Sequence, residues 1–563
     1  MQNPSPSSEP SVPPPSDPMG LLAAGSGAAG TAGRSHRLLF RMRRWLHLPS
    51  WLSAWLALGG AAMAIFFAVY LIDYYRAASR PLLSPLRLLF RFDIETAQNA
   101  LGNLAQVVVA VLGIVITVVS IVVQLSATRY TPRIATLFFR DRKNLAMLGF
   151  FVVTCILSLW VSLSVSADLV PRLAIALTLG LVTLSLLLIL PYFAYVFDFL
   201  DPEKIIHRIQ EQTLILSVTN QGSTGSRQRA VLDGIEQISD IAVNAITSRD
   251  QLIAASAVDA LKDLGVGYLP LKIAQEPPWF QLGRDVRTSP DFVSMAKESL
   301  AALNSDGTWV EWKILRQLLN VYSVAIAELP DIGHLIAIDA RYLGEAALET
   351  NDRASLRVCI KFFNTFIRIA LNTQKVRSAY NVLHQYRQLA EKLIAFEQPE
   401  ILCEVAEHLR YYAQTALNLH LGFVTETLAY DLAALCEEAA KRHSPAHDAM
   451  LGCLLSIDQA AETEAQEVTL RGVRKAQIKL ATAYIEMGNE LAAHRIYLDM
   501  QHERPERLLS IRDELLAVHS KDFWEIVDRG TNFDYLEPPR KEKLKTFFGW
   551  FDNLDELPMS SEK

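Results

Sequence analysis

The sequence predicts an all-α integral membrane protein, with four transmembrane helices followed by a cytoplasmic helical-repeat domain. Three observations predict this fold class. The chain of 563 residues is 51% hydrophobic, and its mean hydropathy is positive at +0.18. Four long segments between residues 45 and 197 contain no Asp, Glu, Lys or Arg. Beyond residue 201, apolar residues recur at steps of three and four, and helix N-terminal signals are frequent.

The domain organisation follows from these changes in composition. Residues 1–33 are rich in Pro, Ser, Gly and Ala, and they bury too little apolar surface to repay the entropy of ordering, so we predict a disordered tail. Each uncharged segment is long enough to cross about 30 Å of hydrocarbon. The predicted parts are a membrane domain at 34–200 with spans near 51–72, 104–126, 145–166 and 173–197, a membrane-proximal helical region at 201–270, a helical-repeat domain at 285–535, and a C-terminal helix and tail at 538–563.

The distribution of charge predicts the topology. Residues 1–197 hold 15 Lys and Arg against 7 Asp and Glu, whereas residues 198–563 hold 39 against 53. Twelve basic residues flank the spans on the side of the two termini and five on the other side, which predicts that both termini are cytoplasmic. The acidic second half argues against a nucleic-acid partner, because phosphate contacts need clustered Lys and Arg. The lipid bilayer is therefore the first predicted partner.

Small and polar residues form a stripe along the second predicted span. They recur at steps of three or four, which places them on one helix face. The stripe consists of Gln106, Gly113, Thr117, Ser120, Gln124 and Thr128. Two interpretations stay open. The stripe is either a packing seam that meets a similar face of the third span at Thr154, Ser158 and Ser162, or the lining of a pore in a homo-oligomer.

The loop after the second span carries a resemblance to a known family. The segments 124–133, 138–141 and 148–151 read QLSATRYTPR, FFRD and LGFF. They resemble the central signature of the bacterial predicted membrane proteins known as domain of unknown function 2254. The residues of this signature loop are Thr131, Pro132, Arg133, Arg140 and Asp141. The resemblance implies a multi-pass protein of the bacterial inner (plasma) membrane with a cytoplasmic extension, and it implies no catalytic residues.

One segment near the C-terminus resembles a tetratricopeptide repeat. Small residues stand where two helices would cross, aromatic residues stand beside them, and a proline follows. The residues of this repeat core are Leu480, Ala481, Tyr484, Gly488, Ala493, Tyr497 and Pro505. The alternative interpretation is a plain helical hairpin with ordinary core residues.

The search for catalytic and metal-binding motifs is negative. The sequence contains no GxxxxGK[ST], GxSxG, HExxH or CxxC motif, so we predict neither an enzyme nor a bound cofactor or metal. The favoured function is a membrane-anchored scaffold or sensor that binds a protein partner through its cytoplasmic helical domain. The alternative is a homo-oligomeric channel lined by the second span.

Overall fold

The computed structural model describes residues 94–129, 133–166, 171–219, 222–457, 464–523, 529 and 532–551, together with scattered residues between 64 and 75. The described residues form helices and no strand, which confirms the all-α class. They fall into two compact units, one with the described residues up to 109 and residues 153–192, the other with residues 110–152 and those from 193 onward. The division crosses three helices, and each unit is described by itself.

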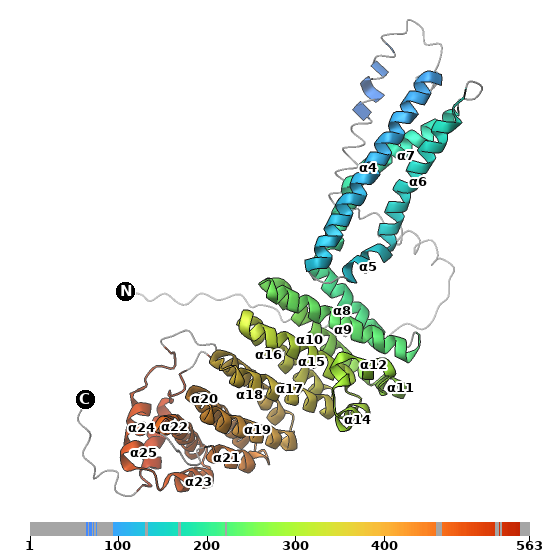
Figure 1. Ribbon diagram of the computed structural model, residues 1–563. Coiled ribbons are helices and arrows are strands. Elements are labelled where there is room, and N and C mark those ends of the chain that lie inside the picture. Colours follow the sequence, from blue (N-terminus) through green and yellow to red (C-terminus); the bar gives the residue numbers. More distant parts are fainter. Residues whose placement is uncertain are drawn as a thin grey trace, which may run out of the picture. The chain divides into compact units, whose positions relative to one another are not determined.

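The described part of the membrane domain holds α4 (Ile94–Arg129), α5 (Arg133–Arg140), α6 (Arg142–Ser164) and α7 (Arg172–Phe199) (Figure 1). Among the described residues, three stretches are long and apolar enough to cross a membrane, namely Asn99–Thr128, Arg142–Ser164 and Arg172–Phe199. They confirm the predicted spans 104–126, 145–166 and 173–197 as helices. The first predicted span, 51–72, lies almost entirely outside the described residues, as does the tail 1–33, so the total of four spans stays a prediction.

The first unit holds a small apolar core between three helices. Leu101 of α4, Val161 of α6, Val165 just after α6, and Ile175 of α7 pack together and are nearly fully buried. Outside this core large apolar side chains are exposed, for example Leu173, which is 89% exposed. Such surfaces are favourable only against hydrocarbon, where a helix satisfies all its backbone hydrogen bonds internally.

Three long helices follow directly after the membrane domain. They are α8 (Pro202–Val218), α9 (Thr224–Thr247) and α10 (Gln251–Lys272). Each begins after a side-chain cap, because Asp201, Ser223 and Asp250 accept hydrogen bonds from backbone amides of the first turn. Four short helices lead onward, α11 (Pro277–Phe280), α12 (Arg284–Thr288), α13 (Pro290–Val293) and α14 (Lys297–Asp306).

A stack of helices of equal length follows. The helices α15 (Trp309–Glu328), α16 (Pro330–Glu349), α17 (Arg353–Asn372), α18 (Val376–Ala395), α19 (Pro399–Asn418) and α20 (Gly422–Lys441) each have 20 residues. From α16 to α20, each helix begins 23 positions after the one before it. The chain continues with α21 (His447–Leu455), α22 (Glu464–Glu486), α23 (Glu490–Met500), α24 (Pro505–Ala517) and α25 (Pro538–Phe548).

The loops that follow α16, α17, α18, α19 and α20 share one geometry. A residue in the left-handed conformation ends each turn, at positions also spaced by 23: Asn351, Gln374, Glu397, His420 and His443, with φ between 52° and 58°. The next amide bonds back to a carbonyl five residues earlier, as in Asp352 N to Ala347 O at 2.8 Å and Leu421 N to Ala416 O at 2.9 Å. This bond closes the helix C-terminus and turns the chain sharply into the next helix.

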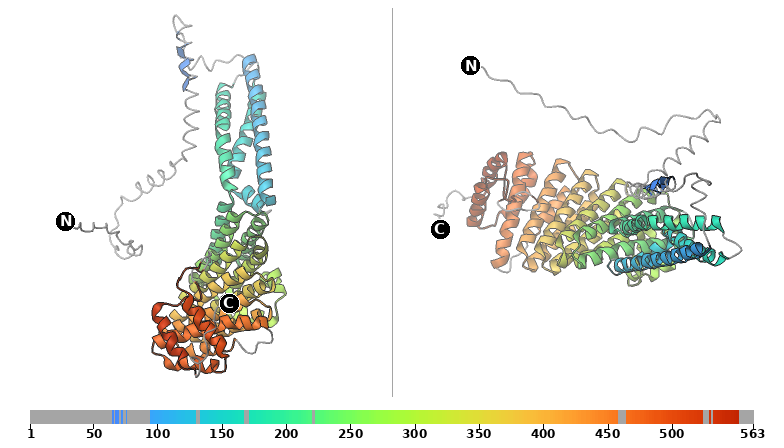
Figure 2. Two further views of the ribbon diagram at one scale, coloured as in Figure 1. Left: turned by 90° about the vertical axis from the view of Figure 1, so that its left-hand side faces the viewer. Right: turned by 90° about the horizontal axis from the view of Figure 1, so that it is seen from above.

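The helices form two rows. We call α10, α16, α18, α20 and α22 the even row, because each packs beside the next, and α9, α15, α17, α19 and α21 pack in the same way as a second row (Figures 1 and 2). Gly344 permits one close approach within the even row, since a Cβ atom there would lie only 2.9 Å from the Leu389 side chain. Helix pairs therefore recur every 46 residues in this stack, whereas tetratricopeptide repeats recur every ~34. The predicted tetratricopeptide-like character is not confirmed.

Candidate functional site

The polar stripe of α4 lies on an exposed helix face. Gln106, Gly113, Thr117, Ser120, Gln124 and Thr128 are all exposed. The hydroxyls of Thr117 and Thr128 donate to carbonyls of their own helix, but within the described part of the chain the amide of Gln124 has no hydrogen-bond partner. The buried face of α4 is apolar instead and consists of Leu101, Ala105, Val108, Val115, Val119 and Val123.

The polar face of α6 is placed in the opposite way. Thr154 and Ser158 are fully buried, Ser162 is half-buried, and Ser158 donates to its own helix at 2.7 Å. The stripe on α4 is exposed, whereas this face of α6 is mostly buried.

The signature loop is a capped junction between α5, α6 and α7. Asp141 accepts hydrogen bonds from the amides of Lys143 at 2.9 Å and Asn144 at 3.2 Å, and so caps α6. The phenol of Tyr195, on α7, donates to the same carboxylate. Burial opposes the charge, but these hydrogen bonds outweigh it and lower the pKa of Asp141 below its usual value.

Aromatic packing completes this junction. Phe138 is fully buried and meets Phe199 edge to face at 5.3 Å, while the guanidinium of Arg208 lies 4.1 Å from the Phe199 ring centre. The amide of Asn144 donates to the Phe138 carbonyl at 3.1 Å. Of the predicted signature residues, Arg140 is exposed, Thr131 and Pro132 lie outside the described residues, and only the backbone of Arg133 is described. The loop thus forms a structural connection through Phe138 and Asp141, which belong to the signature read from the sequence, and Tyr195, which the sequence did not indicate.

The predicted repeat core forms a helical hairpin. Leu480, Ala481 and Tyr484 on α22 are buried, as is Ala493 on α23, and Tyr497 is half-buried. Gly488 turns the chain with a φ of 75°, a left-handed conformation that suits glycine. Pro505 does not end α23 but begins α24.

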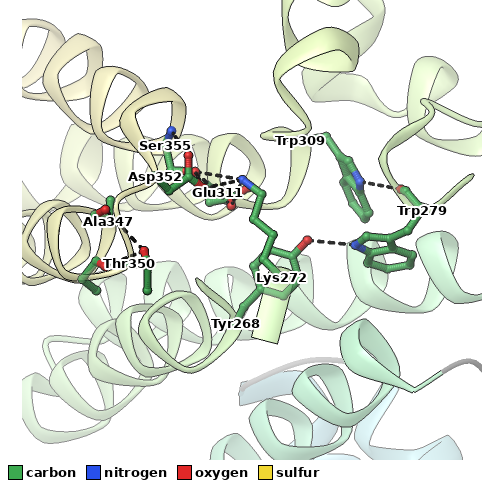
Figure 3. A network of polar contacts seen from close by, with 10 residues as sticks. Tyr268, Lys272, Trp279, Trp309, Glu311, Ala347, Thr350, Asp352 and Ser355 are labelled. Atoms are coloured by element: carbon green, nitrogen blue, oxygen red, sulfur yellow. Dashed lines mark hydrogen bonds and ion pairs between the residues drawn. The ribbon is translucent and has the colours of Figure 1, made fainter. Parts of the chain in front are cut away.

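A buried ion network joins α10, α15 and α17 (Figure 3). The ammonium of Lys272 lies 2.7 Å from Glu311 and 2.7 Å from Asp352, and it donates to the Ser355 hydroxyl at 3.0 Å. Glu311 is only 4% exposed. Burial opposes the charge on Lys272, but the two carboxylates outweigh it and raise the pKa of Lys272, whereas burial raises the pKa of Glu311.

Two tryptophans pack beside this network. Trp279 donates from its indole nitrogen to the Tyr268 hydroxyl at 2.8 Å, and Trp309 donates to the Trp279 carbonyl at 3.1 Å (Figure 3). Arg227 lies over the Trp279 ring at 4.6 Å and bonds to Gln275 at 3.0 Å. These contacts fasten the three helices after the membrane domain to the start of the stack.

A charged groove crosses the even row. A hollow of about 840 Å³ is lined by residues of α16, α18 and α20, which we call the even-row groove. Its charged residues balance in sign, with Arg341, Lys392, Lys441 and Arg442 against Glu345, Glu391, Glu437 and Glu438. Two alanines, Ala395 and Ala434, lie among these charged residues.

The groove is built from a ladder of contacts that repeats with the helices. Arg341 donates to Gln385 of the next even-row helix at 2.8 Å and pairs with Glu345 on its own helix. Arg387, 46 positions later, repeats both contacts with Asp431 at 3.2 Å and with Glu391. The signal was present in the sequence, since the two Arg-x-x-x-Glu pairs stand 46 positions apart, but a comparison with a period of ~34 does not find it.

The C-terminal segment supplies the next contact in this repeating series. Position 433 on α20, which corresponds to Arg341 and Arg387, is an alanine. Arg540 of α25 supplies the guanidinium instead and binds both oxygens of Glu437, at 2.6 and 3.0 Å. The apolar face of α25 packs on α22, and Leu544, Phe547 and Phe548 are buried, as expected for a helix that caps the stack.

The described residues contain no group of three or more His, Cys, Asp or Glu side chains placed to hold a metal ion. The cysteines among them are unpaired, and burial raises the pKa of Cys359, Cys436 and Cys453.

Comparison with known proteins bears on the membrane half. Residues 49–236 match the family model described as predicted membrane protein (DUF2254). The match includes the signature loop and confirms the resemblance read from the sequence. It ends inside α9, so the helical stack from α10 onward lies outside the matched segment.

Two further comparisons add little. The search of curated proteins found no match. One solved structure, described as "Circular tandem repeat protein with novel repeat topology and enhanced subunit contact surfaces", is 17% identical over 66% of this chain and 86% of that chain, with a TM-score of 0.27. Its likeness is too low to carry an argument about fold or function.

Proposed function

We propose that this protein is a membrane-anchored, non-enzymatic scaffold or sensor that binds a protein partner through the even-row groove of its helical-repeat domain. The observation that carries the proposal is the groove itself, a hollow of about 840 Å³ lined by charges of both signs on three successive even-row helices. Stacked helices create extended surfaces of this kind, which repeat proteins use for binding. A partner segment with charges of both signs would complement the ladder.

Site-specific photocrosslinking in living cells tests this function. A photoreactive residue at Ala395, which is exposed in the groove, should yield a discrete protein adduct. The matched control is Lys361, exposed on α17 of the other row, which should yield none. The variant Glu391→Lys should abolish the adduct at Ala395, because it reverses one charge of the ladder. Equal labelling from both positions, or an adduct indifferent to Glu391→Lys, would reject the groove as the binding surface.

We further propose a protein of the bacterial inner membrane with both termini cytoplasmic, on the basis of the basic residues that flank the predicted spans. Single cysteines at Ala167 and Ser561 provide the test in intact cells. A membrane-impermeant thiol reagent should label Ala167→Cys and leave Ser561→Cys unlabelled until the cells are opened. Labelling of Ser561→Cys in intact cells would contradict this topology.

A homo-oligomeric channel is the second candidate, and the exposed α4 stripe favours it. Polar side chains that face hydrocarbon are costly, so Gln106 and Gln124 gain stability when they meet polar groups of another copy. A ring of such helices would place the stripe around a central pore. The alternative occupant of this face is the first predicted span, 51–72.

The stripe predicts a specific effect of Gln124→Leu. If copies meet at this face, the substitution removes a polar contact between them. The oligomer in detergent should then dissociate at a higher protein concentration than the unmodified protein, and any conductance in planar bilayers should change. Leu125→Val is the matched control, since Leu125 is 63% exposed on the same turn but lies outside the stripe. A protein that is monomeric in mild detergent and shows no conductance under voltage or tension would reject the channel.

A further inference from the structure

A second, smaller cavity of about 240 Å³ lies where the even row meets the C-terminal segment, between α20, α22 and α25. Its charged lining is unequal, unlike that of the even-row groove. Four cations face two carboxylates: Arg387, Lys479, Arg529 and Arg540 against Asp431 and Glu437. Outside this lining, Glu391 pairs with Arg387 and Glu486 pairs with Arg540.

The two carboxylates are already used by the arginines. Asp431 accepts two hydrogen bonds from Arg529, at 2.5 and 3.1 Å, and also lies 3.2 Å from Arg387. Glu437 binds Arg540 and the ammonium of Lys441, the latter at 2.7 Å. Neither carboxylate accepts a hydrogen bond from the fourth cation of the cavity, Lys479.

Lys479 is that fourth cation. Among the described residues it forms no ion pair, and its ammonium donates only to the backbone carbonyl of Phe533. Burial lowers the pKa of Lys479 to about 8, against the attraction of Asp534. Tyr430 and Phe533, stacked at 4.8 Å, form the apolar wall beside it. A buried ammonium without a carboxylate is stabilised by an anion that enters the cavity.

We propose that this cavity binds a small phosphate-bearing anion, held by Lys479 together with Arg387, Arg529 and Arg540. A phosphate oxygen supplies the anionic acceptor that Lys479 lacks among the described residues, and guanidinium groups suit phosphate because they donate in a planar fork. Because Arg529, Phe533 and Arg540 come from the C-terminal segment, the anion also ties that segment to α20 and α22. The cavity shares Ala434 and Glu437 with the even-row groove, whereas Lys479 and Arg529 line the cavity and not the groove.

Thermal unfolding of the full-length protein in detergent, titrated with inorganic phosphate, tests the site. Phosphate stabilises folded proteins in general because it is excluded from their surfaces, so the readout is the difference between variants at equal ionic strength. The unmodified protein should show a saturable rise in Tm. Lys479→Gln keeps a donor for the Phe533 carbonyl but removes the charge, and it should weaken phosphate binding at least tenfold. Lys392→Met, an exposed cation of the neighbouring groove, should keep the full response.

Two further arms make the test decisive. Sulfate keeps its charge between pH 7 and pH 9. The sulfate-dependent rise in Tm should be larger in the unmodified protein than in Lys479→Gln, and this difference should shrink across that range as Lys479 loses its proton. Short-chain phosphatidic acid in the micelle distinguishes a lipid headgroup from free phosphate. If the natural ligand is a lipid headgroup, phosphatidic acid should raise the Tm where inorganic phosphate does not. A Tm response that is equal in the unmodified protein, Lys479→Gln and Lys392→Met for all three anions would overturn the proposal.

Discussion

Lys272→Ala should destabilise the protein by about 3–5 kcal/mol, the usual cost of removing one partner from a buried ion pair. The substitution leaves Glu311, which is 4% exposed, without its cation, and one oxygen of that carboxylate already lacks a hydrogen bond within the described structure. Asp352 and Ser355 would lose the same ammonium. Thermal or denaturant unfolding of the full-length protein in detergent measures the effect.

Two variants show that the loss arises from the buried charge. Arg353→Ala removes an exposed pair with Glu400 at 3.9 Å, and it should cost less than about 1 kcal/mol. The double variant Lys272→Met, Glu311→Gln removes both charges while keeping their volume, and it should recover most of the stability. If the double variant unfolds as readily as Lys272→Ala, lost packing rather than the unpaired carboxylate determines the effect.

Asp339→Asn should stabilise the protein, and the gain should grow as the pH rises. Asp339 on α16 is 1% exposed, with Lys262 at 4.0 Å and the carboxylates of Asp259 and Asp263 nearby. Burial and Asp259 raise its pKa from 3.8 to about 8. The folded protein therefore keeps a proton that the unfolded chain has released, so stability declines from about pH 4 to pH 8.

The sign follows from which state binds the proton. Well below pH 4 the Asp339 carboxyl is protonated in both the folded and the unfolded protein, so ionisation does not affect stability. At pH 8 the unfolded protein has released the proton, whereas the folded protein must either keep it or bury the charge, and either lowers the free energy of unfolding. Asparagine cannot ionise, so Asp339→Asn should gain about 3 kcal/mol of stability at pH 8 and little at pH 4. The figure follows from about 1.4 kcal/mol per pKa unit, reduced because water partly solvates the carboxylates around Asp339. Asp331→Asn, exposed on the same helix, is the control and should show no such pH dependence. Parallel curves for Asp339→Asn and the unmodified protein from pH 4 to pH 8 would contradict this account.

The elements that the sequence predicted best are those decided by local composition. A run of uncharged residues that spans hydrocarbon has few alternatives to a helix, because every backbone amide must bond within the segment, and helices α4, α6 and α7 are found where three of the spans were predicted. Local caps are also visible in the sequence, since Asp201 followed by Pro202 is a helix N-terminal signal and α8 starts there.

The sequence did not show whether the polar faces of α4 and α6 would be buried or exposed. The stripes through Gln124 on α4 and Ser158 on α6 have the same spacing, yet one is exposed and the other is buried. Periodicity shows that residues share a face, but the neighbouring helix determines whether that face is covered. The interval of 23 residues was missed for a related reason: the five helices share apolar spacing and turn geometry rather than a sequence motif, and their left-handed residues include Gln374, Glu397 and His420.

By itself, the sequence determined the all-α class, the apolar helices of the membrane half and the family resemblance, because each depends on residues within one segment. Tertiary structure alone decided which charges meet. Lys272 and Asp352 stand 80 positions apart in the chain, and Arg529 and Asp431 stand 98 apart. Buried charges are stable only where a partner from another element satisfies them, and no property of the single residue records which partner the fold will bring.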